Sequence, residues 1–297
     1  MKKMILMSTL LLMACMVQAQ IVKVNPTLKK GDVKTYLATS NIKASGQDLT
    51  VTINTTYTVT EVTADGYVID VLNSNMKVNN AESAVSRMLV AATEMVNEVN
   101  FKLITDKSGQ VKSIKNYEEV KAKITAGADK LIDGMLKDMP ELGQVLSKEQ
   151  LKEQLMGAVT EDALIKSMCE GSVLTLNGKS IASGAQDEYV NSQGMKMKRF
   201  YLVNGNNKIS STATMNMTQD DMKKMIIEKV EQMAPEQAQM VKDNIDTLLE
   251  SGMLKAEGSE KANYELGADG WVKTMTVENN VKLMGQESAT TTTITRQ

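Results

Sequence analysis

The feature that most constrains the fold of this chain is the regular alternation of apolar and polar residues near its beginning. Residues 34–43, 49–62 and 66–76 are rich in Val, Ile, Thr and Tyr and alternate with a period of two residues. Turn signals separate them at Ser45-Gly46 and at Ala64-Asp65-Gly66. One set of alternating positions is apolar and the other holds Thr, Asn or Lys, as expected when one sheet face packs and the other meets water. The segment therefore predicts an antiparallel meander.

Helical periodicity takes over in the middle of the chain, and strands return in its last third. Further strands are expected at 100–105, 110–115, 172–176, 187–192, 195–204, 207–217, 253–266, 270–284 and 287–296. Helices are expected at 80–99, 120–139, 147–156, 160–168, 218–233 and 235–252, with caps at Asn80, Ser147, Thr160 and Thr218. This order predicts an α+β fold, in which amphipathic helices pack on one face of a curved antiparallel sheet with meanders at both ends of the chain.

The N-terminus has the pattern of a signal peptide. Lys2 and Lys3 precede a 13-residue apolar run, and Val17-Gln18-Ala19 places small residues where a signal peptidase cuts. The run is shorter than the roughly 20 residues that span a bilayer as a helix. We therefore expect cleavage before Gln20 and export to the periplasm or the extracellular space.

A second interpretation of the same segment stays open. Leu12-Met13-Ala14-Cys15 resembles a lipobox, in which Cys15 would be lipidated and would anchor the protein. In either case residues 20–297 are expected to form a single domain, because none of the three prolines lies in a linker-like stretch. Similar turn-and-strand segments beginning at Thr63, Thr105 and Gly267 leave open a domain of two similar halves.

Composition excludes several functions. Beyond the leader the chain carries 32 basic and 36 acidic side chains without long basic runs, so no nucleic-acid partner is expected. Histidine is absent, which excludes Ser-His-Asp and Cys-His catalysis and the common zinc sites. The single cysteine beyond the leader, Cys169, is expected to be a buried small side chain. Adjacent acids such as Glu118-Glu119 point to different sides of a helix. We therefore expect no enzyme activity, no cofactor, no metal site and no transmembrane segment.

Methionine is the unusual component, with 23 residues against two Phe and one Trp. Its simplest role is to fill a core that is poor in aromatic side chains. A functional role is a plastic cavity that accepts an apolar ligand such as a lipid. The candidate ligand-binding residues have alternating or helical spacing and are Met195, Met197, Met215, Met217, Met222 and Met225. The same thioethers also have spacings suited to Cu(I), which remains an alternative.

Three short segments carry a resemblance to a known group of proteins. They are Lys29-Lys30-Gly31-Asp32, the hairpin from Tyr57 to Gly66 and Asp269-Gly270-Trp271, and with the export signal they resemble uncharacterised secreted proteins of the Bacteroidota, a domain of unknown function. The order of strands, helices and strands also resembles periplasmic lipoprotein carriers, whose half-barrel sheet encloses acyl chains. These motifs are turn and strand patterns, and they transfer no functional residue.

Two functional hypotheses follow. The first is an exported, non-enzymatic module that holds an apolar, lipid-like ligand between sheet and helices. The second is a structural or interaction protein that pairs with an unidentified protein partner through an exposed sheet edge, for which residues 290–293 are the candidate strand.

Overall fold

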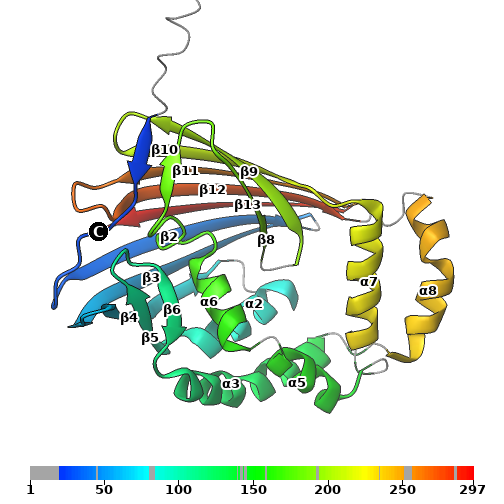
Figure 1. Cartoon of the computed structure of the whole chain (residues 1–297). Coiled ribbons are helices and arrows are strands. Elements are labelled where there is room, and N and C mark those ends of the chain that lie inside the picture. Colours follow the sequence, from blue (N-terminus) through cyan, green and yellow to red (C-terminus); the bar gives the residue numbers. More distant parts are fainter. Residues whose placement is uncertain are drawn as a thin grey trace, which may run out of the picture.

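A long antiparallel sheet flanked by helices makes up the protein (Figure 1). The computed structural model describes residues 20–44, 46–79, 84–138, 140, 143, 146–157, 159–191, 194–233, 235–250, 256–283 and 286–297. In these residues the strands are β1 (Ile21–Lys23), β2 (Val33–Ala44), β3 (Gln47–Val62), β4 (Gly66–Val78), β5 (Asn100–Asp106), β6 (Val111–Ile114), β7 (Ser180–Ala182), β8 (Gln186–Val190), β9 (Lys196–Asn204), β10 (Lys208–Met215), β11 (Ala256–Leu266), β12 (Val272–Leu283) and β13 (Gln286–Arg296). The helices are α2 (Ala84–Val96), α3 (Tyr117–Asp138), α5 (Lys148–Gly157), α6 (Glu161–Cys169), α7 (Gln219–Met233) and α8 (Pro235–Glu250). The α+β prediction is confirmed.

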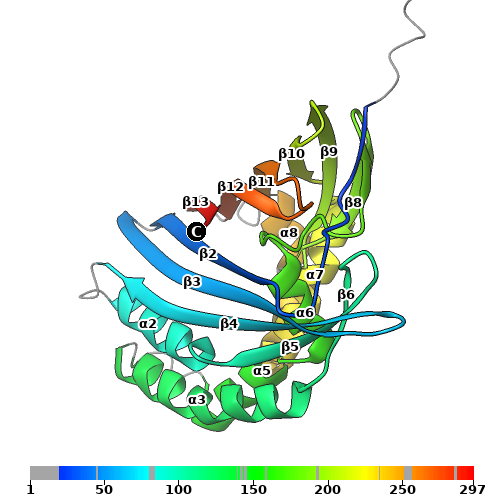
Figure 2. The same ribbon diagram turned by 90° about the vertical axis from the view of Figure 1, so that its left-hand side faces the viewer.

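The main sheet has 11 strands in the order β6-β5-β4-β3-β2-β13-β12-β11-β10-β9-β8. The two ends of the described chain meet in its middle, where β2 pairs with β13 in the register Thr39↔Thr293. Figure 2 shows how the two meanders continue from this junction around a curved sheet. The edges are β6 and β8, which have four and five residues.

The proposed exposed edge at residues 290–293 is wrong. These residues belong to β13, whose backbone is hydrogen-bonded to β12 on one side and to β2 on the other. Four consecutive Thr residues, which are β-branched, predict a strand. The place of that strand in the sheet depends on a pairing between the ends of the described chain that no local pattern encodes.

The concave face of the sheet, called the inner face below, carries the core. Its side chains come from one set of alternating positions, including Tyr36, Tyr57, Tyr201 and Tyr264, all of which are buried. Tyr36 and Tyr57 pack edge to face with ring centroids 5.7 Å apart, and Trp271 lies 5.9 Å from Tyr57. These few aromatic rings gather at the end of the sheet where the β2–β13 pair begins.

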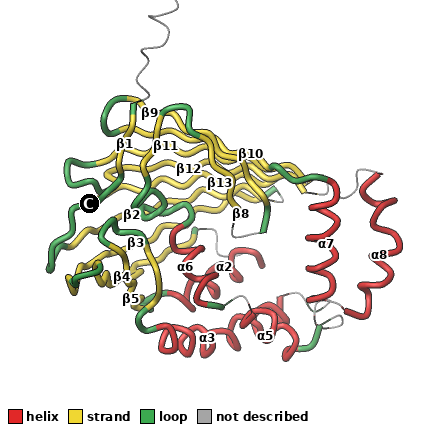
Figure 3. The backbone as a smooth tube through the Cα atoms, viewed as in Figure 1, coloured by secondary structure: helices red, strands yellow, loops and turns green. Residues whose placement is uncertain are grey.

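Three of the helices that Figure 3 shows in red begin next to their predicted capping residues. The Oγ1 atom of Thr160 accepts a hydrogen bond from the N–H of Ala163 at 3.2 Å. Ser147 and Gln150 form the reciprocal bonds of a capping box at α5. Thr218 and Asp221 do the same at α7. The predicted caps at these three helices are therefore confirmed.

Two parts of the prediction are wrong. Residues 172–176 form consecutive turns and not a strand, because Thr175 and Ser172 donate their hydroxyls to the carbonyl of Cys169 and the backbone bonds run from residue i+3 to residue i. The apolar side chains of Val173, Leu174 and Leu176 are buried in the core all the same. The sequence pattern also missed β1 and β7, a separate two-stranded sheet.

Helices α7 and α8 pack against each other at one end of the sheet and not along its face (Figure 1). In the described part of the chain no helix is both long and apolar enough to cross a bilayer. The predicted leader, the Asn80 cap, Met139 and Gly252 lie outside the described residues.

Candidate functional site

Strand alternation places four successive side chains of β9 on the inner face. They are Met197, Arg199, Tyr201 and Val203, and all are buried, whereas the residues between them are exposed. Antiparallel register then sets Met197 opposite Met215 on β10 and opposite Tyr189 on β8. The same register brings Arg199 beside Ala213 and Asp187.

The methionines form a cluster at the end of the sheet nearest α7. We call it the methionine cluster; its members are Met195, Met197, Met215, Met217, Met225, Ala213 and Tyr189. Five of the six predicted ligand-binding methionines are thus brought together. Met222 is not a member, and it lies half-buried on α7 one turn before Met225.

A cavity of about 320 Å³ adjoins this cluster. The C-terminal end of α6, the β8–β9 hairpin and strands β11, β12 and β13 line it. Apolar wall residues include Met195, Met197 and Val281, while Tyr189, Asn279 and Thr290 supply polar groups. The wall is therefore amphipathic.

A larger groove of about 860 Å³ lies at the hairpin ends of the same strands. Its wall includes the charged side chains of Lys43, Asp48, Lys282 and Glu287, of which Lys282 and Glu287 form an ion pair at 3.0 Å. Such an open, charged surface is a weaker candidate for an apolar ligand than the smaller cavity.

The central strands leave apolar side chains half-exposed on the inner face. Ala38 and Ile42 share the orientation of the buried Tyr36, and register places Ile53 opposite Ala38. A filled core covers inward apolar residues almost completely. The helices therefore leave part of the inner face uncovered.

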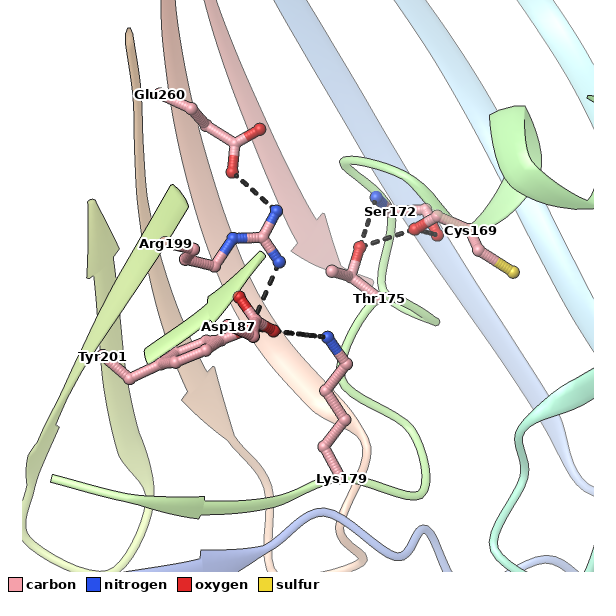
Figure 4. A network of polar contacts seen from close by, with 8 residues as sticks. All are labelled: Cys169, Ser172, Thr175, Lys179, Asp187, Arg199, Tyr201 and Glu260. Carbon is pink, nitrogen blue, oxygen red and sulfur yellow. Dashed lines mark hydrogen bonds and ion pairs between the residues drawn. The ribbon is translucent and has the colours of Figure 1, made fainter. Parts of the chain in front are cut away.

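A charged network around the buried Arg199 follows Met197 along β9, and Figure 4 shows its side chains. Arg199 is only 5% exposed, and its guanidinium donates to the Tyr201 hydroxyl at 3.2 Å and to Glu260 Oε1 at 3.3 Å. It also stacks over the ring of Tyr189, 3.9 Å from the centroid. The Tyr201 hydroxyl in turn donates to Asp187 at 3.0 Å, and Lys179 approaches Asp187 at 3.7 Å.

Burial controls the acid–base behaviour of this network. Desolvation raises the pKa of Glu260, and the positive charge of Arg199 lowers it. Desolvation lowers the pKa of Lys179, and the charge of Arg199 lowers it further. Burial also raises the pKa of Tyr189 to about 12.

In the described residues, Asp187 Oδ1, Arg199 Nε and Ser211 Oγ are buried without a hydrogen-bond partner. These unsatisfied atoms mark the network as a place for a polar ligand group or water.

The sequence analysis missed this network. The signal was present in the alternation of Met197, Arg199 and Tyr201, which places a cation on an apolar face.

Burial raises the pKa of the half-buried Cys169 thiol to about 11, so it stays protonated at neutral pH. Among the described residues, no three His, Cys, Asp or Glu side chains converge as metal ligands.

Known proteins show little similarity to this chain. No protein-family model and no curated protein matches the chain. Among solved structures, one described as "Lipid-protein interactions in lipovitellin" is similar at 8% identity, with a TM-score of 0.37 over 91% of this chain. The chain spans 25% of the length of that protein. At this TM-score the likeness is no basis for assigning a fold or a function.

Proposed function

We propose that the protein binds an apolar or amphipathic small molecule, such as a lipid, on the inner face of its sheet, and that it does so without catalysing a reaction. The observation that supports this proposal is the methionine cluster beside the cavity of about 320 Å³. Small-molecule sites typically enclose about 300–1,000 Å³. Methionine is unbranched and polarizable, so its side chains repack around ligands of different shapes.

The uncovered part of the inner face supports the same proposal. Ala38, Ile42 and Ile53 keep apolar surface exposed on the concave side of the sheet. A ligand that extended from the cavity along β2 and β3 would remove this surface from water, which stabilises a complex by roughly 25 cal/mol per Å².

The absence of histidine from the sequence and the state of the Cys169 thiol support a role without catalysis. The chain contains no histidine, and its Cys169 thiol is protonated at neutral pH because burial raises its pKa to about 11.

Filling the cavity from the backbone tests the proposal. Gly258 lines the cavity, and a Cβ atom added there would lie 3.8 Å from the Cβ of Met215, an ordinary contact. We expect Gly258→Leu to fold normally and to weaken the binding of a fluorescent lipid probe at least tenfold, because the new side chain enters the cavity. Native mass spectrometry of protein purified from its source identifies any ligand that co-purifies.

Thr212→Leu is the matched control, since Thr212 is exposed on the outer face of the neighbouring strand β10. It should leave probe binding unchanged. Equal binding by the wild type and Gly258→Leu, or no binding by the wild type, would refute the proposal.

We also propose that the protein is exported and cut before Gln20, on the pattern of Lys2, Lys3 and the apolar run that follows. An intact mass that begins at Gln20 would support cleavage by a signal peptidase. A mass that begins at a lipidated Cys15 would show the anchored form instead, and a chain that keeps Met1 would refute export.

A further inference from the structure

Four side chains of the methionine cluster come from two neighbouring strands in register. Met197 lies directly opposite Met215, and side chains in this relation have Cβ atoms about 4.5–5.5 Å apart. A backbone hydrogen bond of 2.9 Å just beyond β10 continues the pairing toward Met195 and Met217. All four belong to one packed group. The register of β9 and β10 therefore gathers four thioethers into one patch.

A fifth thioether reaches this patch from a helix. Met225 lies on α7 and packs against the buried part of the cluster, which includes Met195 and Met197. A methionine side chain is unbranched and has three rotatable bonds, so sulfur atoms from neighbouring positions can turn toward a common point. Two strands and one helix thus supply soft ligand atoms from different directions.

We propose that the methionine cluster binds a soft monovalent metal ion such as Cu(I) through the thioethers of Met197, Met215 and Met225. Thioether sulfur is a soft ligand and selects Cu(I), whereas carboxylate and carbonyl oxygens suit hard ions. In the described part of the chain, no three His, Cys, Asp or Glu side chains form a competing site. The inference goes beyond the proposed function and does not rest on it.

The cavity of about 320 Å³ gives an ion a route to the cluster. Met195 and Met197 line this cavity, although they are only 8% and 4% exposed. Their side chains therefore border an enclosed space and lie largely away from bulk water. An entry path to the ligands is one of the requirements for a metal site.

The charges around the cluster are compatible with a single positive charge. Within the described residues, no lysine or arginine lines the cavity. Arg199 follows Met197 on the inner face of β9, but its guanidinium is paired with Glu260 at 3.3 Å. Thioethers are neutral and cannot compensate the charge of an ion, and an uncompensated buried charge is costly. A monovalent ion is therefore favoured over a divalent one.

Thioether ligands also predict how binding depends on pH. Cysteine and histidine must lose a proton before they bind a metal, and a carboxylate must be ionised, whereas the methionine sulfur carries no titrating proton. We therefore expect the affinity for the ion to stay constant between about pH 5 and pH 8.

Isothermal titration calorimetry with Ag(I) in chloride-free buffer tests the inference, because Ag(I) is as soft as Cu(I) and needs no reductant. All proteins carry Cys169→Ser, since that thiol is another soft ligand. We expect the double variant Met197→Leu/Met215→Leu and the single variant Met225→Leu each to bind at least tenfold more weakly. These changes conserve side-chain volume. Met240→Leu, at a 60% exposed position on α8, is the matched control and should bind normally.

Sulfur atoms in residues 1–19 are the same in every protein compared, so only differences between variants are read. Equal affinity in the double variant and in Met240→Leu would overturn the inference, and so would an absence of Ag(I) uptake. A loss of affinity toward about pH 5 would assign the ion to ionisable ligands and overturn it as well. Circular dichroism checks the fold, and Met225→Leu decides the result should the double variant unfold. Any of these failures leaves the apolar site standing.

Discussion

At the scale of single residues, Asp106 fixes the turn between β5 and β6. Although burial opposes its ionisation, hydrogen bonds from Ser108, Lys112 and Gln110 lower its pKa from 3.8 to about 2. A pKa that is lower in the folded than in the unfolded state stabilises the fold above the unfolded value, and this contribution is lost as the pH falls from about 4 toward 2.

We therefore expect Asp106→Asn to lower the free energy of unfolding at pH 7 and to flatten its decline between about pH 4 and pH 2. Urea denaturation at a series of pH values measures both effects. Asp65→Asn, in the exposed turn before β4, is the control. An acid-dependent slope identical to that of the wild type would show that Asp106 is no more stabilised in the folded state than in the unfolded one.

Gly270 tests how closely the chain packs around the aromatic core. Its φ is +77°, and an added Cβ would lie 2.6 Å from the carbonyl oxygen of Asn25. Gly205, with a φ of +71°, has open space around it. Gly205→Ala should cost about 1–2 kcal/mol from backbone strain alone, and Gly270→Ala should cost a further 1–3 kcal/mol, roughly, from the clash. Equal losses in thermal unfolding would show that the Asn25 backbone yields freely.

The candidate site could be predicted from the sequence only where the spacing of residues fixes the direction of their side chains. Alternation of Met195 with Met197 and of Met215 with Met217 indicated a shared face, and the structure unites them. Met222 and Met225 have helical spacing, but the rotation of α7 decides which of them reaches the sheet, and local spacing does not set it. The Arg199–Glu260 pair joins strands 61 residues apart in sequence, a separation that no local pattern encodes.

At the scale of elements, α6 forms one wall of the cavity and depends on its cap. We expect Thr160→Ala to cost about 1 kcal/mol of stability, because the N–H of Ala163 loses its acceptor. Thr160→Ser keeps the hydroxyl and should be close to neutral. Chemical denaturation compares the two variants. A loss of the same size in Thr160→Ser would assign the effect to the methyl group and not to the cap.

Elements were predictable where side-chain period and capping agreed, as in β2, β3, β4, α5 and α6. The strand predicted at residues 172–176 was wrong because apolar side chains in tight turns give the same short apolar sequence as a buried strand. Their hydroxyl bonds to Cys169 decide between the two structures, and those bonds depend on the position of α6. The three residues of β1 are too few to produce a periodic pattern.

At the scale of the whole molecule, the pairing of β2 with β13 creates the continuous inner face. It joins two meanders that would each have a free edge, and residues of β11, β12 and β13 line the cavity together with the end of α6. The cavity therefore exists only in the folded chain, and a ligand that binds it must stabilise the whole fold and not a local segment.

This linkage gives a quantitative prediction for an uncharged probe such as decanol. At a free concentration of one hundred times its Kd, a ligand that binds only the folded state stabilises it by about 2.7 kcal/mol. Since 1 kcal/mol shifts the melting temperature of a large domain by roughly 2–4 °C, we expect differential scanning calorimetry to show a rise of about 5–10 °C. In Gly258→Leu the added side chain occupies the same volume, so the shift should be largely abolished. A similar shift in both proteins would place the bound probe away from Gly258, which lines both this cavity and the larger groove.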